Sequence, residues 1–422
     1  MLAILARPIG LLVLKDVRTV RALLLLSVTL LPVALTSVLN GYFTAVRRAY
    51  KNAVSQVTEQ GIKIALTTYL LIAVAPKTVE GGVFAVLMGG AVAESASLLF
   101  NYIQYVWDKK HFRQIAQKTT GSPIRVAAIA MPVAISAYIR SGLLALEHIL
   151  IPIGLKSFGA DYATALSSYG ALSSMALPVV LYPAALLSSF AALLIPEITE
   201  QESTGNTLEI RYIAGRVYQM TLLFSVGIAA TMLFLAGELG EVLYRNAEVA
   251  HYIKWLAPLV PIMYMDTATD AMLKGLGQQV YSMNVNIIDA LISVICVKLL
   301  VPHMGIAGYL LTIYITEIFN ATCSICRLIK ISGYTPNPIK LLIRPMISGI
   351  GATCIARLLI TAVSQSENLS PLTLTVHVLA VIALYLALLL ATNAFGRADW
   401  KWIASLFVTG TKRAERARRS DC

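Results

Sequence analysis

Charged residues are scarce in this sequence: they make up 13% of the 422 residues, whereas 57% are hydrophobic. A soluble domain carries about 25% charged residues, so the composition argues against a water-soluble enzyme and against a disordered chain. Apolar runs of about 18 or more residues recur instead, and each is long enough to cross about 30 Å of hydrocarbon as a helix. We therefore expect an all-α polytopic membrane protein.

Several signatures of enzymes and pumps are also missing. The sequence has no Asp-x-Asp for a metal-bound sugar nucleotide, no His-x4-Asp and no Walker Gly-x4-Gly-Lys-Ser/Thr. Cys323 and Cys326 form a CxxC, but no second cysteine pair or spaced histidine accompanies it, so we expect apolar thiols and no metal site. A membrane enzyme is thus the weaker alternative, and no cofactor is expected.

The hydrophobic pattern predicts one partial segment, at about 1–14, and eleven full spanning segments. The full segments lie at about 22–42, 61–76, 81–106, 124–154, 162–196, 211–237, 249–274, 280–302, 304–328, 341–363 and 370–396. The partial segment is too short to span, and it lacks the basic region and cleavage site of a signal peptide. We expect it to be the remnant of a longer protein.

The basic residues indicate the orientation. The net charge is +12, and most loop lysines and arginines fall on one set of alternate loops, which includes 107–123 and the tail 397–422. The positive-inside rule predicts that this side, with the C-terminus, is cytoplasmic. Trp400, Trp402 and Phe407 alternate with basic residues in the tail, a pattern typical of an interfacial helix on anionic lipid. Membrane lipids are therefore expected partners, and nucleic acid is not.

An internal repeat is visible between two stretches of the chain. An offset of 234 residues relates Gly41 to Gly275 and Asn52 to Asn286, and an offset of 223 relates Gly82 to Gly305 and Glu94 to Glu317. The stretches lie an even number of helices apart and so have the same orientation. This pattern predicts two parallel lobes around an axis along the membrane normal, with a central cavity.

Ionisable residues within the predicted spans are candidates for function because burying a charge in the bilayer is unfavourable. Arg140, Glu147 and His148 lie in the segment 124–154. A guanidinium binds phosphate oxygens bidentately, which makes Arg140 a candidate ligand of a pyrophosphate, while Glu147 and His148 are candidates to hold a proton or a cation. In the alternative interpretation, Arg140 and Glu147 bridge neighbouring helices and neutralise one another.

The segment 249–274 adds Asp266 as a further candidate of the substrate cavity. Asp270 and Lys274 are spaced as an ordinary i,i+4 pair at the membrane interface. Three other carboxylates fall near the middle of predicted helices and are candidates for cation coupling or for helix packing: Glu94, Asp289 and Glu317. Because Glu94 and Glu317 occupy equivalent repeat positions, a shared role between helices is favoured for them.

Several motifs resemble the stage V sporulation protein B group of the multidrug/oligosaccharidyl-lipid/polysaccharide exporter superfamily. The matching stretches are GYF at 41–43, NAVSQVTEQ at 52–60, LEHILIP at 146–152, LIPEITE at 194–200, LKGLGQQ at 273–279 and PHMGIAGY at 302–309. The resemblance runs from about residue 15 to 395. It implies fourteen helices in two lobes, so this chain is expected to lack the N-terminal two to three helices.

The resemblance divides the chain into five parts: a truncated first lobe (1–106), a basic loop (107–123), a second lobe (124–330), two additional helices (331–396) and a basic tail (397–422). It implies a flippase in a bacterial cell membrane that moves an undecaprenyl-pyrophosphate-linked saccharide for cell-wall, polysaccharide or spore synthesis, with a coupling cation as a further partner. The alternatives are a cation-coupled multidrug exporter of the same superfamily, an inactive truncated homologue and a non-transporting partner of wall-synthesis enzymes.

Overall fold

The structure is a computed structural model that describes residues 2–8, 10–11, 18–45, 49–74, 78–112, 123–159, 161–335, 339–363, 370–392 and 394–396. The described residues are predominantly helical and include no strand, which confirms the predicted all-α class. The chain separates into two compact units, Met1–Ser122 and Pro123–Cys422. The predicted basic loop falls mostly, and the tail 397–422 entirely, outside the described residues.

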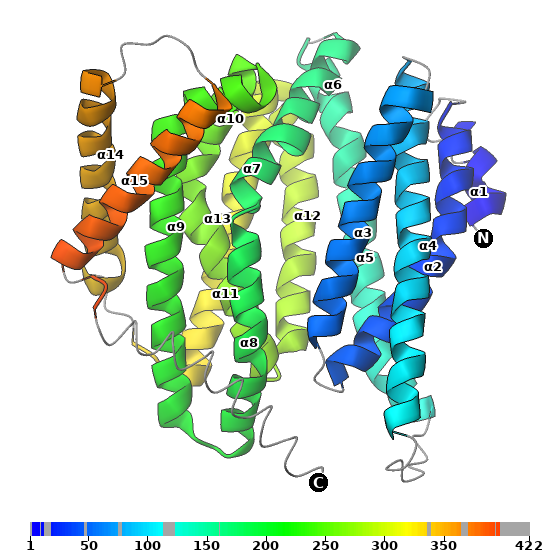
Figure 1. Ribbon diagram of the computed structural model, residues 1–422, viewed down its shortest axis with the longest axis horizontal. Coiled ribbons are helices and arrows are strands. Elements are labelled where there is room, and N and C mark those ends of the chain that lie inside the picture. The colour runs from blue at the N-terminus through cyan, green and yellow to red at the C-terminus, as the bar shows by residue number, and fades with distance from the viewer. Residues whose placement is uncertain are drawn as a thin grey trace. The chain divides into compact units, whose positions relative to one another are not determined.

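The first unit is built around one long helix. It consists of α1 (Leu2–Pro8), α2 (Arg18–Ala45), α3 (Ala49–Tyr69), a π-helical turn η2 (Leu70–Val74) and α4 (Val79–Phe112). Helix α4 packs along both α2 and α3, whereas α2 and α3 have few contacts with each other. We call α2, α3 and α4 the first bundle (Figure 1).

The second unit contains the remaining helices. They are α5 (Pro123–Ser157), α6 (Tyr162–Gly170), η3 (Ala171–Ala176), α7 (Leu177–Leu181), α8 (Ala184–Ser203), α9 (Thr207–Tyr244), α10 (Ala247–Leu256), η4 (Ala257–Leu259), α11 (Val260–Gly275), α12 (Gln279–Met304), α13 (Ile306–Ser332), η5 (Ile339–Ile343), α14 (Arg344–Val363) and α15 (Pro371–Ala391). Side chains cap several of these helices: Asn206 accepts from the Glu209 amide and Asn246 from the Glu248 amide, satisfying donors that a helix leaves unpaired.

Apolar packing between α9, α10 and α11 forms the main core of the second unit. Tyr218, Ile253 and Tyr264 are all buried there. The Tyr264 hydroxyl donates to the carbonyl of Val180 at 2.8 Å, which links α11 to α7. Because a buried phenol needs a partner, this hydrogen bond fixes where the broken helix α6–η3–α7 lies against the core.

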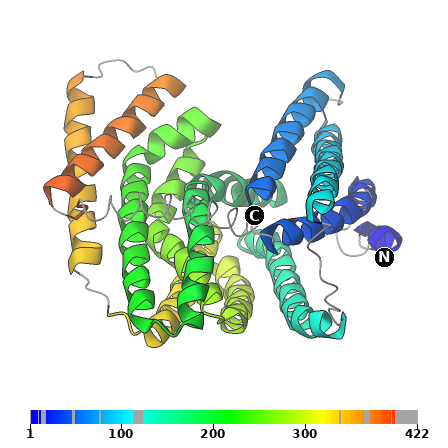
Figure 2. The same ribbon diagram turned by 60° about the horizontal axis from the view of Figure 1, so that its bottom comes forward.

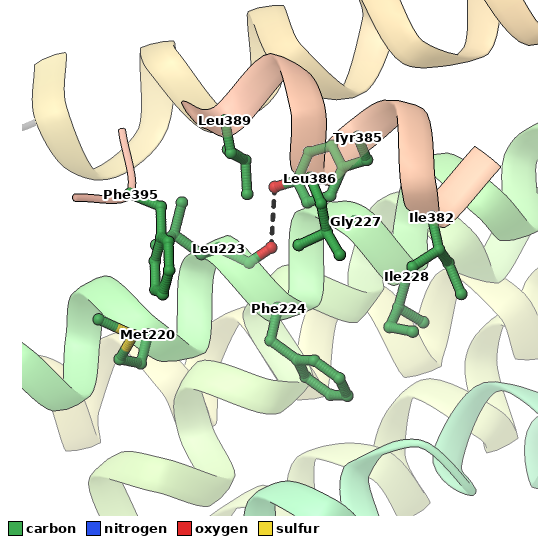
Figure 3. Close-up of a pocket in the computed structure, with 10 residues that line it drawn as sticks. All are labelled: Met220, Leu223, Phe224, Gly227, Ile228, Ile382, Tyr385, Leu386, Leu389 and Phe395. Atoms are coloured by element: carbon green, nitrogen blue, oxygen red, sulfur yellow. Dashed lines mark hydrogen bonds between the residues drawn. The ribbon is translucent and has the colours of Figure 1, made fainter. Parts of the chain in front are cut away.

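Helices α14 and α15 pack on α9, and α15 runs obliquely beside α14 in both views (Figures 1 and 2). Gly227 of α9 permits this approach, since a Cβ there would lie 2.6 Å from the ring of Tyr385. The Tyr385 hydroxyl donates to the carbonyl of Leu223 at 2.8 Å. Beside this contact lies an apolar pocket of about 250 Å³ between α9 and α15, lined by Phe224, Leu386 and other hydrophobic side chains (Figure 3).

Nine helical stretches within the described residues are long and apolar enough to cross a membrane, and they match nine of the eleven expected segments. The other two segments are helical but do not qualify. Residues 61–69 belong to α3, whose first half is rich in polar residues, and residues 70–74 form η2. The segment 249–274 is divided by the 3₁₀ turn η4, which contains Pro258 and is followed by Pro261 at the start of α11. Proline lacks the amide that would continue the hydrogen-bond ladder, so α10 and α11 are separate helices.

A second bundle in the larger unit repeats the packing of the first. Helix α13 packs along both α11 and α12, whereas α11 and α12 have few contacts with each other. The stretches that the sequence repeat pairs are α2 with α11, α3 with α12 and α4 with α13. In both bundles the third helix therefore packs on the other two. That the two bundles superpose stays a prediction.

Candidate functional site

A tight turn between α11 and α12 brings polar side chains of the two helices together. Gly277 has a φ of +68°, a conformation that favours glycine. The next residue, Gln278, accepts hydrogen bonds from Nε and Nη2 of Arg327 on α13 at 3.2 and 2.7 Å. This clamp holds the turn, so that Ser282 of α12 lies against Asp270 of α11 and donates a hydrogen bond to its Oδ1.

A cavity of about 370 Å³ lies at this position, where α5 packs along α12. Side chains of α5, α11 and α12 line it: Ser136, Ala137, Arg140, Ser141, Leu144, Asp270, Lys274, Gln279, Ser282, Met283 and Asn286. Most of these side chains are polar, in contrast to the pocket between α9 and α15. The cavity can therefore accept a polar group within an otherwise apolar helical unit.

The cavity lining carries two cations and one carboxylate. Nζ of Lys274 lies 4.0 Å from Oδ2 of Asp270, a loose i,i+4 ion pair. Arg140 is exposed and makes no hydrogen bond or ion pair within the described part of the chain. An arginine without a paired carboxylate keeps its planar set of donors available for an anion. Counted over the lining side chains alone, the formal charge is +1.

Three half-buried carboxylates interact electrostatically with Arg140 without lining the cavity: Asp266, Asp289 and Glu317. They come from α11, α12 and α13, the three helices of the second bundle. Asn286 and Asn320 extend the polar contact between α12 and α13, with 3.5 Å from Nδ2 of Asn320 to Oδ1 of Asn286. The structure therefore places Asp266 in the carboxylate group beside the cavity and Arg140 in its lining.

Glu147 and His148 lie further along α5 and do not line the cavity. Glu147 is buried beside Ser293 of α12, and Nδ1 of His148 hydrogen-bonds the hydroxyl of Tyr169 on α6. Both residues join α5 to its neighbours. The role of a bridge between helices therefore fits Glu147 better than Arg140. Among the described residues, Arg140 and Glu147 do not form an ion pair with each other.

Glu94 belongs to the first unit, on α4, where it faces Glu59 and Lys63 of α3. No group of three or more histidine, cysteine, aspartate or glutamate side chains suited to a metal occurs among the described residues.

Sequence reasoning did not recognise Lys274 as a cavity residue, because its spacing from Asp270 already explained it as an interfacial pair. The sequence signal that could have identified it is its position one residue before Gly275, next to the turn between α11 and α12.

Comparison with known proteins identifies relatives of this chain. Stage V sporulation protein B of Bacillus subtilis (strain 168) is 27% identical over 308 residues, which cover 71% of this chain and 59% of the relative. The chain is homologous to stage V sporulation protein B. Lipid II flippase MurJ of the same organism is 22% identical over 342 residues, covering 74% of this chain and 60% of MurJ. The chain thus spans about three fifths of the length of these relatives, and no family model matches it.

Solved structures show the same fold. A lipid II flippase MurJ in an inward closed conformation superposes with a TM-score of 0.61 at 12% identity, over 88% of this chain and 73% of MurJ. A MATE protein in a bent conformation gives a TM-score of 0.58 at 15% identity, over 79% of this chain and 76% of the other. The resemblance drawn from the motifs is confirmed, and the chain is a multi-pass membrane protein with the fold of the exporter superfamily.

Proposed function

We propose that this chain forms part of a flippase that moves a lipid-linked saccharide, attached through a pyrophosphate, across a bacterial cell membrane by alternating access. The observation that carries the proposal is Arg140, which lines a cavity of mostly polar side chains and has no ion-pair partner among the described residues. The relatedness to MurJ, which is named a lipid II flippase, supports the same substrate class. Within this proposal the C-terminal tail is cytoplasmic and the protein performs transport rather than catalysis.

The charges of the cavity distinguish this proposal from a cation-coupled drug exporter. A cavity for cationic drugs should present carboxylates such as Glu147 and Asp266, with Arg140 turned away. Here the two cations Arg140 and Lys274 line the cavity with one carboxylate, that of Asp270, whereas Glu147 and Asp266 do not line it. This arrangement supports an anionic substrate. The carboxylates that interact with Arg140 are the candidates to hold a coupling cation or proton.

The chemistry of a lipid-linked saccharide matches two features of the second unit. Its pyrophosphate must leave water to cross the membrane, and a fixed guanidinium offsets part of that unfavourable desolvation through two parallel hydrogen bonds. Its hydrocarbon chain needs apolar surface, and the pocket between α9 and α15 is lined by apolar side chains, with the Tyr385 hydroxyl turned to the Leu223 carbonyl (Figure 3).

Flipping of a fluorescent lipid-linked pyrophosphate saccharide by the purified protein in proteoliposomes tests the proposal. Removing the guanidinium in Arg140→Ala is expected to reduce flipping at least about tenfold, because a hydrogen bond to a charged group contributes roughly 1.5–3 kcal/mol. Arg140→Lys keeps the charge but loses the planar donor set, so partial activity is expected. The matched control is Lys254→Ala, which removes an exposed cation of α10. Full activity of Arg140→Ala at normal protein levels would remove this residue from the mechanism.

A further inference from the structure

We propose that Lys274 is a second phosphate-binding cation of the cavity, and that Asp270 is the counter-ion which Lys274 exchanges for the substrate. Without substrate, Lys274 pairs with Asp270. A diphosphate replaces Asp270 as the partner of the Lys274 ammonium, whereas a monophosphate binds to Arg140 alone. The inference rests on the proposed function, because it assumes that the cavity receives an anionic lipid headgroup. Lys274 then makes the cavity prefer a diphosphate to a monophosphate, and Asp270 helps the bound diphosphate to leave.

The geometry of the pair makes such an exchange feasible. Nζ of Lys274 and Oδ2 of Asp270 are 4.0 Å apart, and the lysine side chain is 50% exposed whereas the aspartate is 22% exposed. The other carboxylate oxygen of Asp270 accepts the hydrogen bond from Ser282. Asp270 is therefore held by α12, while the flexible lysine can move. An exposed ion pair of this kind contributes little stability, so a phosphate can compete with it.

The charge of the lining points to the same division of roles. Arg140 has no carboxylate within ion-pair distance among the described residues, so it is available to any phosphate. Lys274 becomes available only when an incoming anion replaces Asp270. A ligand with a single phosphate binds to Arg140 alone, whereas a ligand with two phosphates binds more tightly because its second phosphate contacts Lys274 as well. As the ligand leaves, Asp270 pairs with the lysine again, which lowers the barrier to release.

The sequence repeat provides independent support. At the offset of 234 residues, Asp270 corresponds to Thr36 and Lys274 to Asn40 of the first bundle. The two bundles pack in the same pattern, so the fold of such a bundle does not require a charge at either position. The pair Asp270–Lys274 is therefore a feature of the bundle that lines the cavity, rather than a requirement of helix packing.

Binding of two soluble probes to the full purified chain tests the inference: farnesyl diphosphate and farnesyl monophosphate. The wild type is expected to bind the diphosphate about fivefold more tightly than the monophosphate, because one added contact to an exposed cation contributes at most about 1 kcal/mol. Lys274→Gln should abolish this preference with little change for the monophosphate. Asp270→Asn should raise affinity for the diphosphate about three- to fivefold and slow its dissociation. Lys254→Gln is the matched control.

A double-mutant cycle separates counter-ion exchange from a structural role. Asp270→Asn should have no effect on diphosphate affinity in the Lys274→Gln background, and Asp270→Glu should restore the wild-type affinity. Should Asp270→Asn fold poorly, Asp270→Thr copies the residue of the first bundle. In flipping assays, Asp270→Asn should lower KM and kcat together, because tighter binding delays release.

The possible failures can be told apart. If the wild type binds neither probe, the proposed function is wrong, and the inference with it. If the wild type binds both probes and Arg140→Gln abolishes binding, but Lys274→Gln retains the preference for the diphosphate, the proposed function stands and the inference is overturned. An effect of Asp270→Asn that persists without Lys274 would likewise overturn it.

Discussion

The first bundle (α2, α3 and α4) and the second bundle (α11, α12 and α13) place polar side chains at the same positions but differ in their charges. The same two offsets pair Thr36 with Asp270, Asn40 with Lys274, Asn52 with Asn286, Ser55 with Asp289, Ser97 with Asn320, Asn101 with Ser324 and Gln104 with Arg327. In four of these seven pairs a neutral residue of the first bundle is charged in the second. At these seven positions the charges therefore belong to the second bundle, which lines the cavity.

The neutral positions of the first bundle show which polar groups serve packing. Ser55 and Ser97 are buried and hydrogen-bond each other at 3.2 Å between α3 and α4. Their counterparts Asp289 and Asn320 lie on the facing helices α12 and α13, where Asn320 instead contacts Asn286. A polar contact between the second and third helix is therefore common to both bundles. The charges of the second bundle exceed what this contact needs, which is why they are the better candidates for function.

One buried ion pair departs from this pattern, because both of its charges belong to the first bundle alone. Nζ of Lys51 lies 2.5 Å from Oδ1 of Asp108, and both side chains are nearly buried. The ammonium also lies 5.3 Å from the centroid of the buried Phe43 ring. The repeat places Val285 and Ile331 at the corresponding positions. The second bundle therefore has apolar residues at the positions of this ion pair.

The largest effect is expected from breaking this ion pair. Lys51→Ala or Asp108→Ala leaves an uncompensated buried charge, which should lower the free energy of unfolding by about 3–5 kcal/mol. Replacing both residues with those of the other repeat, Lys51→Val with Asp108→Ile, should be neutral or stabilising because the desolvation penalty of both charges disappears. Reversible unfolding of the purified protein in mixed detergent measures both. A double variant as unstable as the single ones would show that the bundles differ here in more than charge.

The positions of most helices and the similar packing of the two bundles that the repeat pairs followed from the sequence, whereas the cavity that Arg140 lines and the partners of most charges did not. Periodicity and helix length predict where α5, α11 and α12 run, and spacing predicts that Asp270 and Lys274 share a face. No local pattern shows that α5 packs along α12, which is what brings Arg140 to the same cavity as Lys274. Likewise, Lys51 and Asp108 lie 57 residues apart, so only the packing of α3 on α4 reveals their contact.

An intermediate effect is expected at the glycine that both repeats share. A Cβ on Gly275 would lie 3.2 Å from the Ile195 carbonyl oxygen and 3.2 Å from the Ile198 Cβ, where α11 packs on α8. Gly275→Ala should therefore lower the free energy of unfolding by about 1–3 kcal/mol through overpacking. A Cβ on Gly41 meets no described atom within 4 Å, so Gly41→Ala should instead stabilise α2 by about 0.5–1 kcal/mol.

The same unfolding measurement applies to both glycine variants, and each serves as the control for the other. Thr199 of α8 donates a hydrogen bond to the Gly275 carbonyl at 2.9 Å, which keeps the backbones close and prevents easy relaxation. Equal destabilisation by the two substitutions would contradict the difference between the repeats and would indicate that Gly41 is packed as closely as Gly275.

The smallest effect concerns Asn101, which tests whether the first bundle has a binding role of its own. Its side chain is fully buried, and neither amide atom has a hydrogen-bond partner among the described residues. A buried polar group without a partner is unfavourable, so Asn101→Leu should leave the free energy of unfolding unchanged or raise it by about 1 kcal/mol. Ser97→Ala is the control in which a paired buried hydroxyl is lost, and it should be destabilising. Clear destabilisation by Asn101→Leu would mean that the amide is satisfied by something other than the described residues. In that case the first bundle would contain a polar partner for Asn101 in addition to the side chains that the structure describes.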